Sequence, residues 1–220
     1  MKRISKAILL LTIAAILMAG LASCSLTDTL QRLFVGAMDD GTENFDMGVI
    51  ESGVYTSDFA GMQFTLPQGW VFYDREELLA LSGLDENDDA DALKKEILEK
   101  TTVYDMYAVN SSTGSNIIIM FENIRVQGLD PETFGVQDYS EALTKNLSGQ
   151  TEIAYEKTKE RTVALGGYEF LSIEFNANAA AYSYSICQKY FIRQIGDFMM
   201  SIIVTGNVSP ESYFSALDAA

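Results

Sequence analysis

The sequence contains no histidine among its 220 residues, and this absence has wide chemical consequences. Histidine is the commonest general base near neutral pH and the partner that activates the nucleophile in Ser-His and Cys-His catalysis. Those mechanisms and the histidine-rich zinc sites are therefore excluded. The sequence also has no Gly-x-Ser-x-Gly motif, no phosphate-binding loop and no Ser-x-x-Lys motif, so the usual parts of acyl and phosphoryl transfer are missing.

Positive charge is scarce as well. The chain has 15 lysines and arginines against 31 aspartates and glutamates, which gives a formal net charge of −16. So acidic a surface repels the phosphates of nucleic acids and favours cations and basic partners, which excludes nucleic-acid binding. The aliphatic and aromatic content is too high for a disordered chain, and the length predicts one domain with a sizeable core.

The start of the chain has the plan of an exported protein. Lys2, Arg3 and Lys6 give it a positive beginning, and residues 7–17 form an almost unbroken apolar run. This is the pattern of a secretory signal. The alternatives are a single membrane-spanning anchor or an ordinary signal that is cut elsewhere, but the run is shorter than the roughly 20 residues that cross a bilayer.

The signal ends in Leu21-Ala22-Ser23-Cys24. This run resembles the lipobox of bacterial lipoproteins, in which the cysteine receives a diacylglyceryl group, the peptide is cut before it, and the acylated cysteine becomes the first residue. The resemblance implies a signal peptide over residues 1–23 and a lipid anchor, including palmitate, on Cys24. Loss of three positive and no negative charges with the signal would change the net charge from −16 to −19.

Cysteine is scarce too, with Cys24 and Cys187 as its two occurrences. If Cys24 carries lipid, no intramolecular disulfide can form. Cys187 lies in a strand-like run of tyrosines and apolar residues, which predicts a buried structural thiol, not a nucleophile.

Composition and periodicity divide the remaining chain into a flexible tether, residues 24–52, and a single α+β domain, residues 53–220. The apolar run at residues 117–121 has no alternation, which predicts a central strand that is covered on both faces. The expected strands are residues 54–59, 62–66, 103–110, 116–123, 152–157, 162–165, 168–175, 182–193 and 198–205. The expected helices are residues 76–81, 92–100, 131–146 and a last helix that starts at Pro210.

The most recognisable segment of the expected domain is Phe64-Thr65-Leu66-Pro67-Gln68-Gly69-Trp70, a strand followed by a Pro-x-Gly turn and a tryptophan. With the helices, hairpin, long helix and strand meander that follow, it resembles the PsbP-like α/β/α sandwich. The resemblance implies a mostly antiparallel sheet with helices on both faces. It also implies a function in docking or assembly, because that family has no shared catalytic residues.

One acidic run has the spacing of a metal site. Asp85, Asn87, Asp89 and Glu96 occupy the first, third, fifth and twelfth positions of a calcium loop of the EF-hand type. Ala90 stands where that loop requires glycine, because the sharp turn disfavours a residue with a Cβ atom. The alternative is an acidic loop in which Asp88 or Asp89 caps the following helix and no metal binds.

These observations predict a lipid-anchored protein on the extracytoplasmic face of a bacterial cell membrane, with a non-catalytic domain that binds a protein partner of unknown identity. We expect no cofactor. One alternative is a calcium-binding surface module that uses the acidic loop. The other is a carboxylate-based hydrolase, which would need a concave pocket with two convergent acids. Five aromatic residues of the last third are expected mainly in the core, although they could also line a groove: Tyr182, Tyr184, Tyr190, Phe191 and Phe198.

Overall fold

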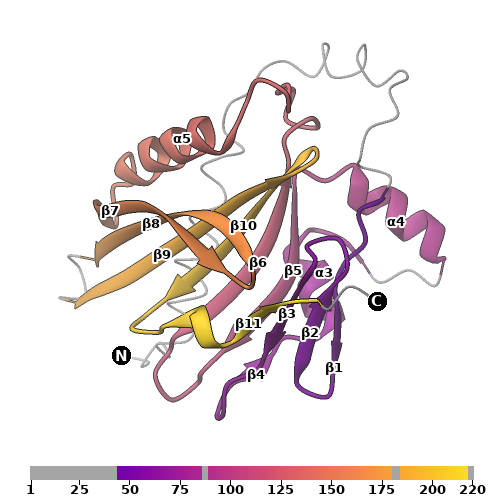
Figure 1. Cartoon of the computed structure of the whole chain (residues 1–220), viewed down its shortest axis with the longest axis horizontal. Helices are drawn as coiled ribbons and strands as arrows, with labels where there is room; N and C mark the ends of the chain where they lie inside the picture. The colour runs from indigo at the N-terminus through magenta and orange to yellow at the C-terminus, as the bar shows by residue number, and fades with distance from the viewer. Residues whose placement is uncertain (1–43, 86–88, 180–183, 218–220) are drawn as a thin grey trace.

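The computed structural model describes residues 44–85, 89–179 and 184–217. They form an α+β fold of two antiparallel sheets with three α-helices in the described residues (Figure 1). The predicted fold class and the antiparallel arrangement are therefore confirmed. No helix in these residues has the length and apolarity needed to span a membrane.

The larger sheet has seven strands in the order β4-β5-β6-β10-β9-β8-β7. Their bounds are β4 Val71–Phe72, β5 Thr102–Val109, β6 Asn116–Asn123, β10 Phe198–Thr205, β9 Tyr184–Ile195, β8 Tyr168–Ala179 and β7 Ala154–Leu165. Every residue of β6 and of β10 is buried. This confirms the predicted central strand, because both faces of an inner strand must be covered for a run without alternation to be stable.

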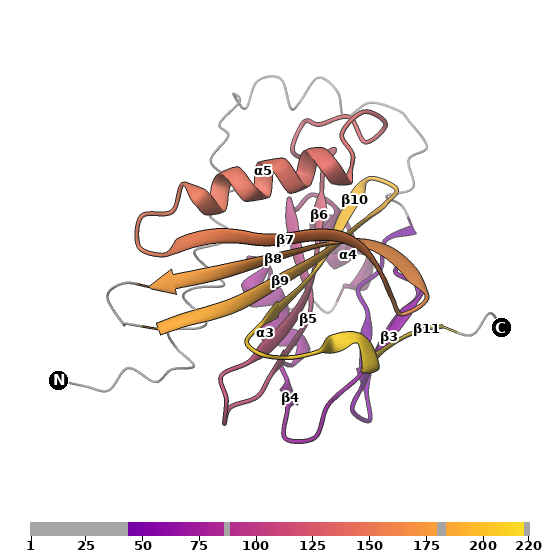
Figure 2. The ribbon, with the colours of Figure 1, turned by 60° about the vertical axis from the view of Figure 1, so that its left-hand side comes forward.

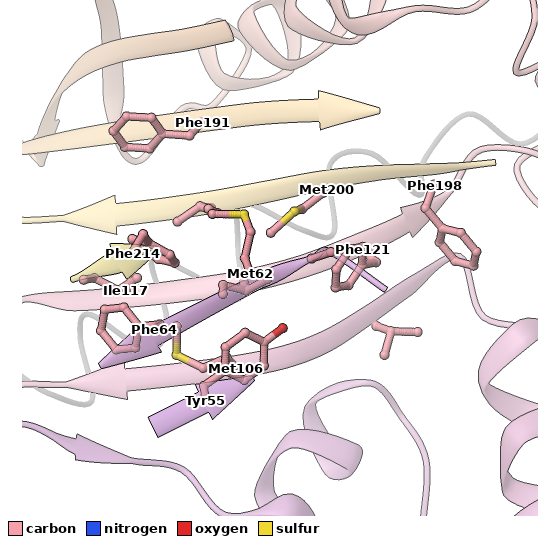
Figure 3. Packing of buried hydrophobic residues seen from close by; sticks show 14 of the residues in the cluster. Tyr55, Met62, Phe64, Met106, Ile117, Phe121, Phe191, Phe198, Met200 and Phe214 are labelled. Atoms are coloured by element: carbon pink, nitrogen blue, oxygen red, sulfur yellow. The ribbon is translucent and has the colours of Figure 1, made fainter. Parts of the chain in front are cut away.

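A smaller sheet packs on one face of the large one. It has the order β1-β2-β3-β11, with β1 Val49–Glu51, β2 Val54–Ser57, β3 Met62–Thr65 and β11 Phe214–Ala216. The core between the two sheets is rich in phenylalanine and methionine, and Figure 3 shows Met62, Phe64 and Phe214 of the small sheet beside Met200 and Phe191 of the large sheet.

The opposite face of the large sheet is covered by α5, Val136–Ser148, which lies along β7 and β8 in Figure 2. Tyr139, Leu143 and Leu147 repeat at helical spacing and are buried against the sheet, as predicted. This second core is rich in tyrosine, because the sheet contributes Tyr104 and Tyr190 to it. The two faces of the large sheet therefore have different chemistry.

Two shorter helices complete the fold. α3, Arg75–Leu81, begins with a capping box in which Asp74 and Glu77 bond to each other's backbone amides. α4, Ala90–Leu98, buries Leu93 and Ile97 in the core between the sheets. Helices therefore lie on both faces of the large sheet, with α5 on one side and α4 beside the small sheet on the other.

The predicted domain boundary at residue 53 is wrong. Phe45 is fully buried, and β1 pairs with β2, so the folded part of the chain includes at least residues 45–52. The Asp, Gly and Asn residues that surround this segment in the sequence favour a flexible tether. The buried side chain and the ladder hydrogen bonds outweigh that local composition.

Three element predictions are also corrected. The helix expected from residue 131 begins only at Val136, after turns. The strands expected at residues 152–157 and 162–165 form the single strand β7, with a bulge between Lys157 and Lys159. The last helix is one 3-10 turn, Pro210–Ser212, after which Phe214 enters β11, pairs with β3 and packs its ring in the core between the sheets.

Candidate functional site

A hollow of about 610 Å³ lies beside α4. Three segments contribute to it: the chain before β1, the first residue of α3, and the inner side of α4. Its size is in the range of small-molecule sites, and it combines an apolar floor with charged groups, as such sites usually do. The lining residues are Phe45, Asp46, Met47, Arg75, Ala90, Asp91, Leu93, Lys94 and Ile97.

The local sequence explains how α4 is placed against the hollow. Asp89 is the N-cap, and its carboxylate accepts hydrogen bonds from the amides of Asp91 and Ala92 at 3.1 and 3.2 Å. Leu93 and Ile97, four residues apart on one face, anchor the helix in the core. Asp91, two residues before Leu93, remains exposed at the hollow.

The hollow contains two positive and two negative side chains. Lys94 forms an ion pair with Asp46 at 2.9 Å, which joins α4 to the segment before β1. Arg75 and Asp91 are both exposed, and no ion pair between them or to another described residue occurs. The side chains of the hollow therefore carry balanced charge, and Arg75 also lies near the buried carboxyl of Asp105.

A buried carboxyl lies behind the hollow, close to Arg75. Asp105 is on β5, at the bulge between Tyr104 and Met106, where it turns toward the small sheet. It accepts a hydrogen bond from the Gly48 amide at 2.8 Å and another from the hydroxyl of Tyr55. Burial raises the pKa of Asp105 to about 6, although both hydrogen bonds and the nearby charge of Arg75 act to lower it.

Gly48 is required for this arrangement. A Cβ atom on Gly48 would lie 2.3 Å from Cε2 of the Tyr55 ring and 2.9 Å from the carbonyl oxygen of Thr56. Both distances are shorter than any normal contact. Glycine therefore allows the chain before β1 to pass close enough to β2 for its amide to reach Asp105.

A second buried carboxyl lies on the other face of the large sheet. Glu122 on β6 accepts a hydrogen bond from the hydroxyl of Tyr139 on α5, and Ser201 on β10 donates to that hydroxyl at 3.4 Å. Burial raises the pKa of Glu122 to about 7, against the effect of the bond from Tyr139. Glu122 is 2% exposed, so it does not reach a substrate from solvent.

Acid–base catalysis by two carboxyls needs both groups at one accessible site. Asp105 and Glu122 are buried on opposite faces of the sheet, and each hydrogen bonds to a tyrosine of a different covering layer. The accessible acids of the hollow are Asp46, which is paired with Lys94, and Asp91. The two carboxyls with raised pKa, Asp105 and Glu122, therefore do not share one accessible site.

The predicted calcium loop adjoins the hollow but has a helical second half. α4 begins at Ala90, the sixth of the twelve positions, so Glu96 lies about 9 Å along the helix from Ala90. Asp89 is an N-cap, as the alternative reading proposed, and Glu96 is exposed. Among the described residues no group of three acids or cysteines is placed to hold a metal ion. Asn87 lies outside those residues, so calcium binding by this run stays a prediction.

The other candidates are distributed between the core and the undescribed segments. Tyr190, Phe191 and Phe198 are buried in the core, as expected. Tyr182 lies outside the described residues. Cys187 on β9 is half-buried, so the prediction of a buried thiol is only partly met. Cys24 also lies outside the described residues, and its lipidation stays a prediction.

Most residues of the hollow carry no signal in the sequence. Asp46 lies in a segment with the composition of a tether, and Arg75 and Lys94 are two charges on short helices. Gly48, followed by the strand-like Val49–Glu51, is one signal, since a glycine before a strand can mark close backbone approach. Asp105 in an otherwise apolar strand was a second signal, because a charged residue in a buried strand needs partners.

Comparison with known proteins gives fold likeness alone. No family model matches the chain, and no curated protein matches it. Among solved structures, the solution structure of PsbP from the cyanobacterium Synechocystis has a TM-score of 0.43 at 12% identity, over 83% of this chain and 98% of that one. A protein of Bacteroides thetaiotaomicron gives 0.39 at 11% identity, over 76% of this chain and 49% of its own.

The third structure is LpqN of Mycobacterium tuberculosis, described as involved in cell envelope biogenesis. It gives a TM-score of 0.34 at 11% identity, over 70% of this chain and 82% of its own. PsbP is thus among the similar structures, and it is the family that the Pro-x-Gly-Trp segment resembles. All three TM-scores are below 0.5, and likeness at that level does not transfer a function.

Proposed function

We propose that the chain is a bacterial lipoprotein, anchored through Cys24 on the extracytoplasmic face of the membrane, whose domain binds a ligand or partner without catalysis. The observation that carries the binding role is the hollow beside α4. It combines an apolar floor with charged side chains and adjoins the beginning of the described domain at Phe45.

The anchoring half of the proposal rests on the sequence. The positive start, the apolar run and Leu21-Ala22-Ser23-Cys24 follow one another in the order of a lipoprotein signal. An acyl chain contributes about 0.8 kcal/mol per buried methylene, so several chains on one cysteine hold a domain firmly at a bilayer. Asn44 lies twenty residues after Cys24, a separation that spans at most about 70 Å. The hollow would therefore operate close to the membrane surface.

The absence of catalysis is supported by the positions of the titratable groups. The two carboxyls with raised pKa, Asp105 and Glu122, are 1% and 2% exposed and hydrogen bond to tyrosines. A general acid must be within hydrogen-bond reach of the group that it protonates. Buried as they are, these carboxyls hold the layers together instead.

Anchoring is tested by growth with an alkyne-tagged palmitate and separation of membrane and aqueous fractions. The wild type is compared with Cys24→Ser and with Cys187→Ser, which removes the other cysteine. The proposal predicts label and membrane association in the wild type and in Cys187→Ser, and loss of label in Cys24→Ser. Label that persists in Cys24→Ser would overturn it.

A further inference from the structure

The large sheet ends at β7, and the outer edge of this strand has no neighbouring strand among the described residues. β7 is last in the strand order and pairs with β8 alone. It is twelve residues long, whereas β4 at the other end of the sheet has two. The amide and carbonyl groups of β7 that point away from β8 are therefore a long template on which a further strand can pair.

The charges of β7 are complementary to those of a second β7. Five of the six central residues are charged: Glu156, Lys157, Lys159, Glu160 and Arg161. When two copies lie antiparallel with their centre between residues 158 and 159, Glu156 of each faces Arg161 of the other. Lys157 then faces Glu160, and Lys159 faces Thr158, so no like charges meet. A shift of one residue in either direction sets Lys157 opposite Lys159 or Arg161, which is unfavourable.

A bulge in β7 places the facing residues on a common face. Residues directly opposite each other in an antiparallel pair share a face, but residues three or five apart in a regular strand do not. In β7 the register with β8 shifts between Lys157 and Lys159, so Thr158 is an extra residue and the alternation restarts after it. The side chains of Lys157 and Glu160 do lie on one face, since their ion pair measures 2.5 Å.

The other facing pair lies on the opposite face. Glu156 follows Tyr155, which packs in the core under α5, so Glu156 points away from that helix. Arg161 is two residues before Val163, which packs against the core between the sheets, so it too points away from α5. Both side chains are exposed and can reach a second copy.

The helix beside β7 covers a face of the sheet and not its edge. Tyr139 and Leu143 of α5 share a core with Ile173 of β8 and Tyr190 of β9. A two-fold axis perpendicular to the sheet keeps α5 on the same face in both copies. The two large sheets can therefore continue as one across the new contact.

We propose that β7 is a self-association edge, on which a second copy of the chain pairs antiparallel in the register that sets Glu156 opposite Arg161. Charges on an edge strand usually prevent pairing with other chains, and here they select the one partner whose charges match. The contact goes beyond the proposed binding function and needs no ligand. Because an edge contact is small, the pair is weak in solution, and anchors that hold both copies at one membrane raise their effective concentration.

The test is sedimentation equilibrium of the full-length protein over a concentration series, in enough nonionic detergent that each micelle holds one chain. We expect a reversible monomer–dimer equilibrium. Glu156→Arg and Arg161→Glu should each weaken it about tenfold or more, because each variant turns two attractive contacts into two repulsive ones. Glu96→Arg makes the same charge change at an exposed position of α4 and should leave the equilibrium unchanged.

A mixture of the two β7 variants tests the register itself. In a pair of one Glu156→Arg chain and one Arg161→Glu chain, the new arginine faces the new glutamate, and the two unchanged residues face each other. The equimolar mixture should therefore recover the wild-type affinity within about threefold. Thermal melting at a concentration where monomers dominate checks that each variant is folded. Arg161→Glu loses a 4.0 Å contact with Glu174, so Glu156→Arg alone decides the result if that variant does not fold.

Three results would each overturn the assignment. The first is a wild type that stays monomeric over the whole series, and the second is dimerisation that survives Glu156→Arg, which would place the contact elsewhere on the chain or in the micelle. The third is a mixture of folded variants that associates no better than either variant alone. None of these results depends on ligand binding, and the mass of the same preparation reports separately whether Cys24 is acylated.

Discussion

The Tyr139 hydroxyl on α5 donates a hydrogen bond to the Glu122 carboxylate on β6, and both side chains are buried. On the opposite face of the same sheet, Tyr55 of the small sheet donates to Asp105 on β5. Each covering layer is thus joined to the central strands by one tyrosine and one buried carboxyl.

Glu122→Gln should change how stability depends on pH. The pKa of Glu122 rises from 4.5 to about 7 on folding, so its contribution to stability is fully present below about pH 4.5 and is lost as pH rises through 7. This loss is about 3 kcal/mol, because each tenfold change in the proton-binding equilibrium of the carboxyl corresponds to about 1.4 kcal/mol. Glutamine stays neutral. In urea unfolding, the free energy of unfolding of the variant minus that of the wild type should therefore increase by about 3 kcal/mol from pH 4.5 to pH 8.

The same difference in unfolding free energy between Glu122→Gln and the wild type at pH 4.5 and at pH 8 would contradict this account. Asp105→Ala is not a suitable control, because it removes the buried partner of Tyr55 and so destabilises the fold for another reason. Glu156→Gln on β7 is suitable, since Glu156 is exposed and should give no pH-dependent difference.

Tyr139→Phe should have the opposite pH pattern. It removes the donor that stabilises ionised Glu122, and a buried acceptor without its partner costs about 1–3 kcal/mol. The cost should be larger at pH 8, where the carboxyl would be charged, than at pH 5. Unfolding of the double variant with Glu122→Gln at pH 8 measures the coupling, and additive effects of the two changes would show that the bond contributes nothing.

Gly48→Ala should destabilise the fold by about 2 kcal/mol or more, because the added Cβ atom would be 2.3 Å from the Tyr55 ring. The ring must shift, and its bond to Asp105 is lost. Gly149→Ala is the matched control: neither glycine has a positive φ, and the nearest contact of a new Cβ atom at Gly149 is an ordinary 3.4 Å. Thermal unfolding should separate the two variants clearly, and equal melting temperatures would refute the role given to Gly48.

Asp89→Ala should lower stability by about 1 kcal/mol, because the N-cap bonds to Asp91 and Ala92 are lost. If capping is the whole role of Asp89, the loss is the same in calcium and in a chelator. Asp85→Ala, which removes an acid from the same run outside the helix, should then change little. A calcium-dependent rise in the melting temperature that both variants abolish would instead establish the calcium loop.

Sequence patterns over a few neighbouring residues predicted the individual strands and helices whose buried faces those patterns describe. The unbroken apolar run of β6 indicated a strand covered on both faces, and the spacing of Tyr139, Leu143 and Leu147 indicated the buried side of α5. The small sheet was not predicted as a separate layer, because β11 joins β3 across most of the chain. A pairing between residues so distant in sequence leaves no short-range signal, and Phe214 fits a helix face as well as a strand.

The hollow could not be predicted for a related reason. Its residues come from three segments that are separated in sequence, and Asp46 acquires its role only because Phe45 is buried. The acidic run at residues 85–96 was visible in the sequence, but so was the alternative of a helix cap, and the geometry of Asp89 follows the cap. The spacing of the acidic residues is compatible with both structures. The position at which α4 begins decides between them for Asp89, because it makes that residue the N-cap.

The most direct measurement of the central claim is the intact mass of the mature protein and of its first proteolytic peptide. The proposed lipoprotein predicts a chain that begins at Cys24 and carries a diacylglyceryl group on that residue, with residues 1–23 absent. A chain that retains residues 1–23, or begins elsewhere with unmodified Cys24, would contradict the account and leave the domain without the anchor proposed for it.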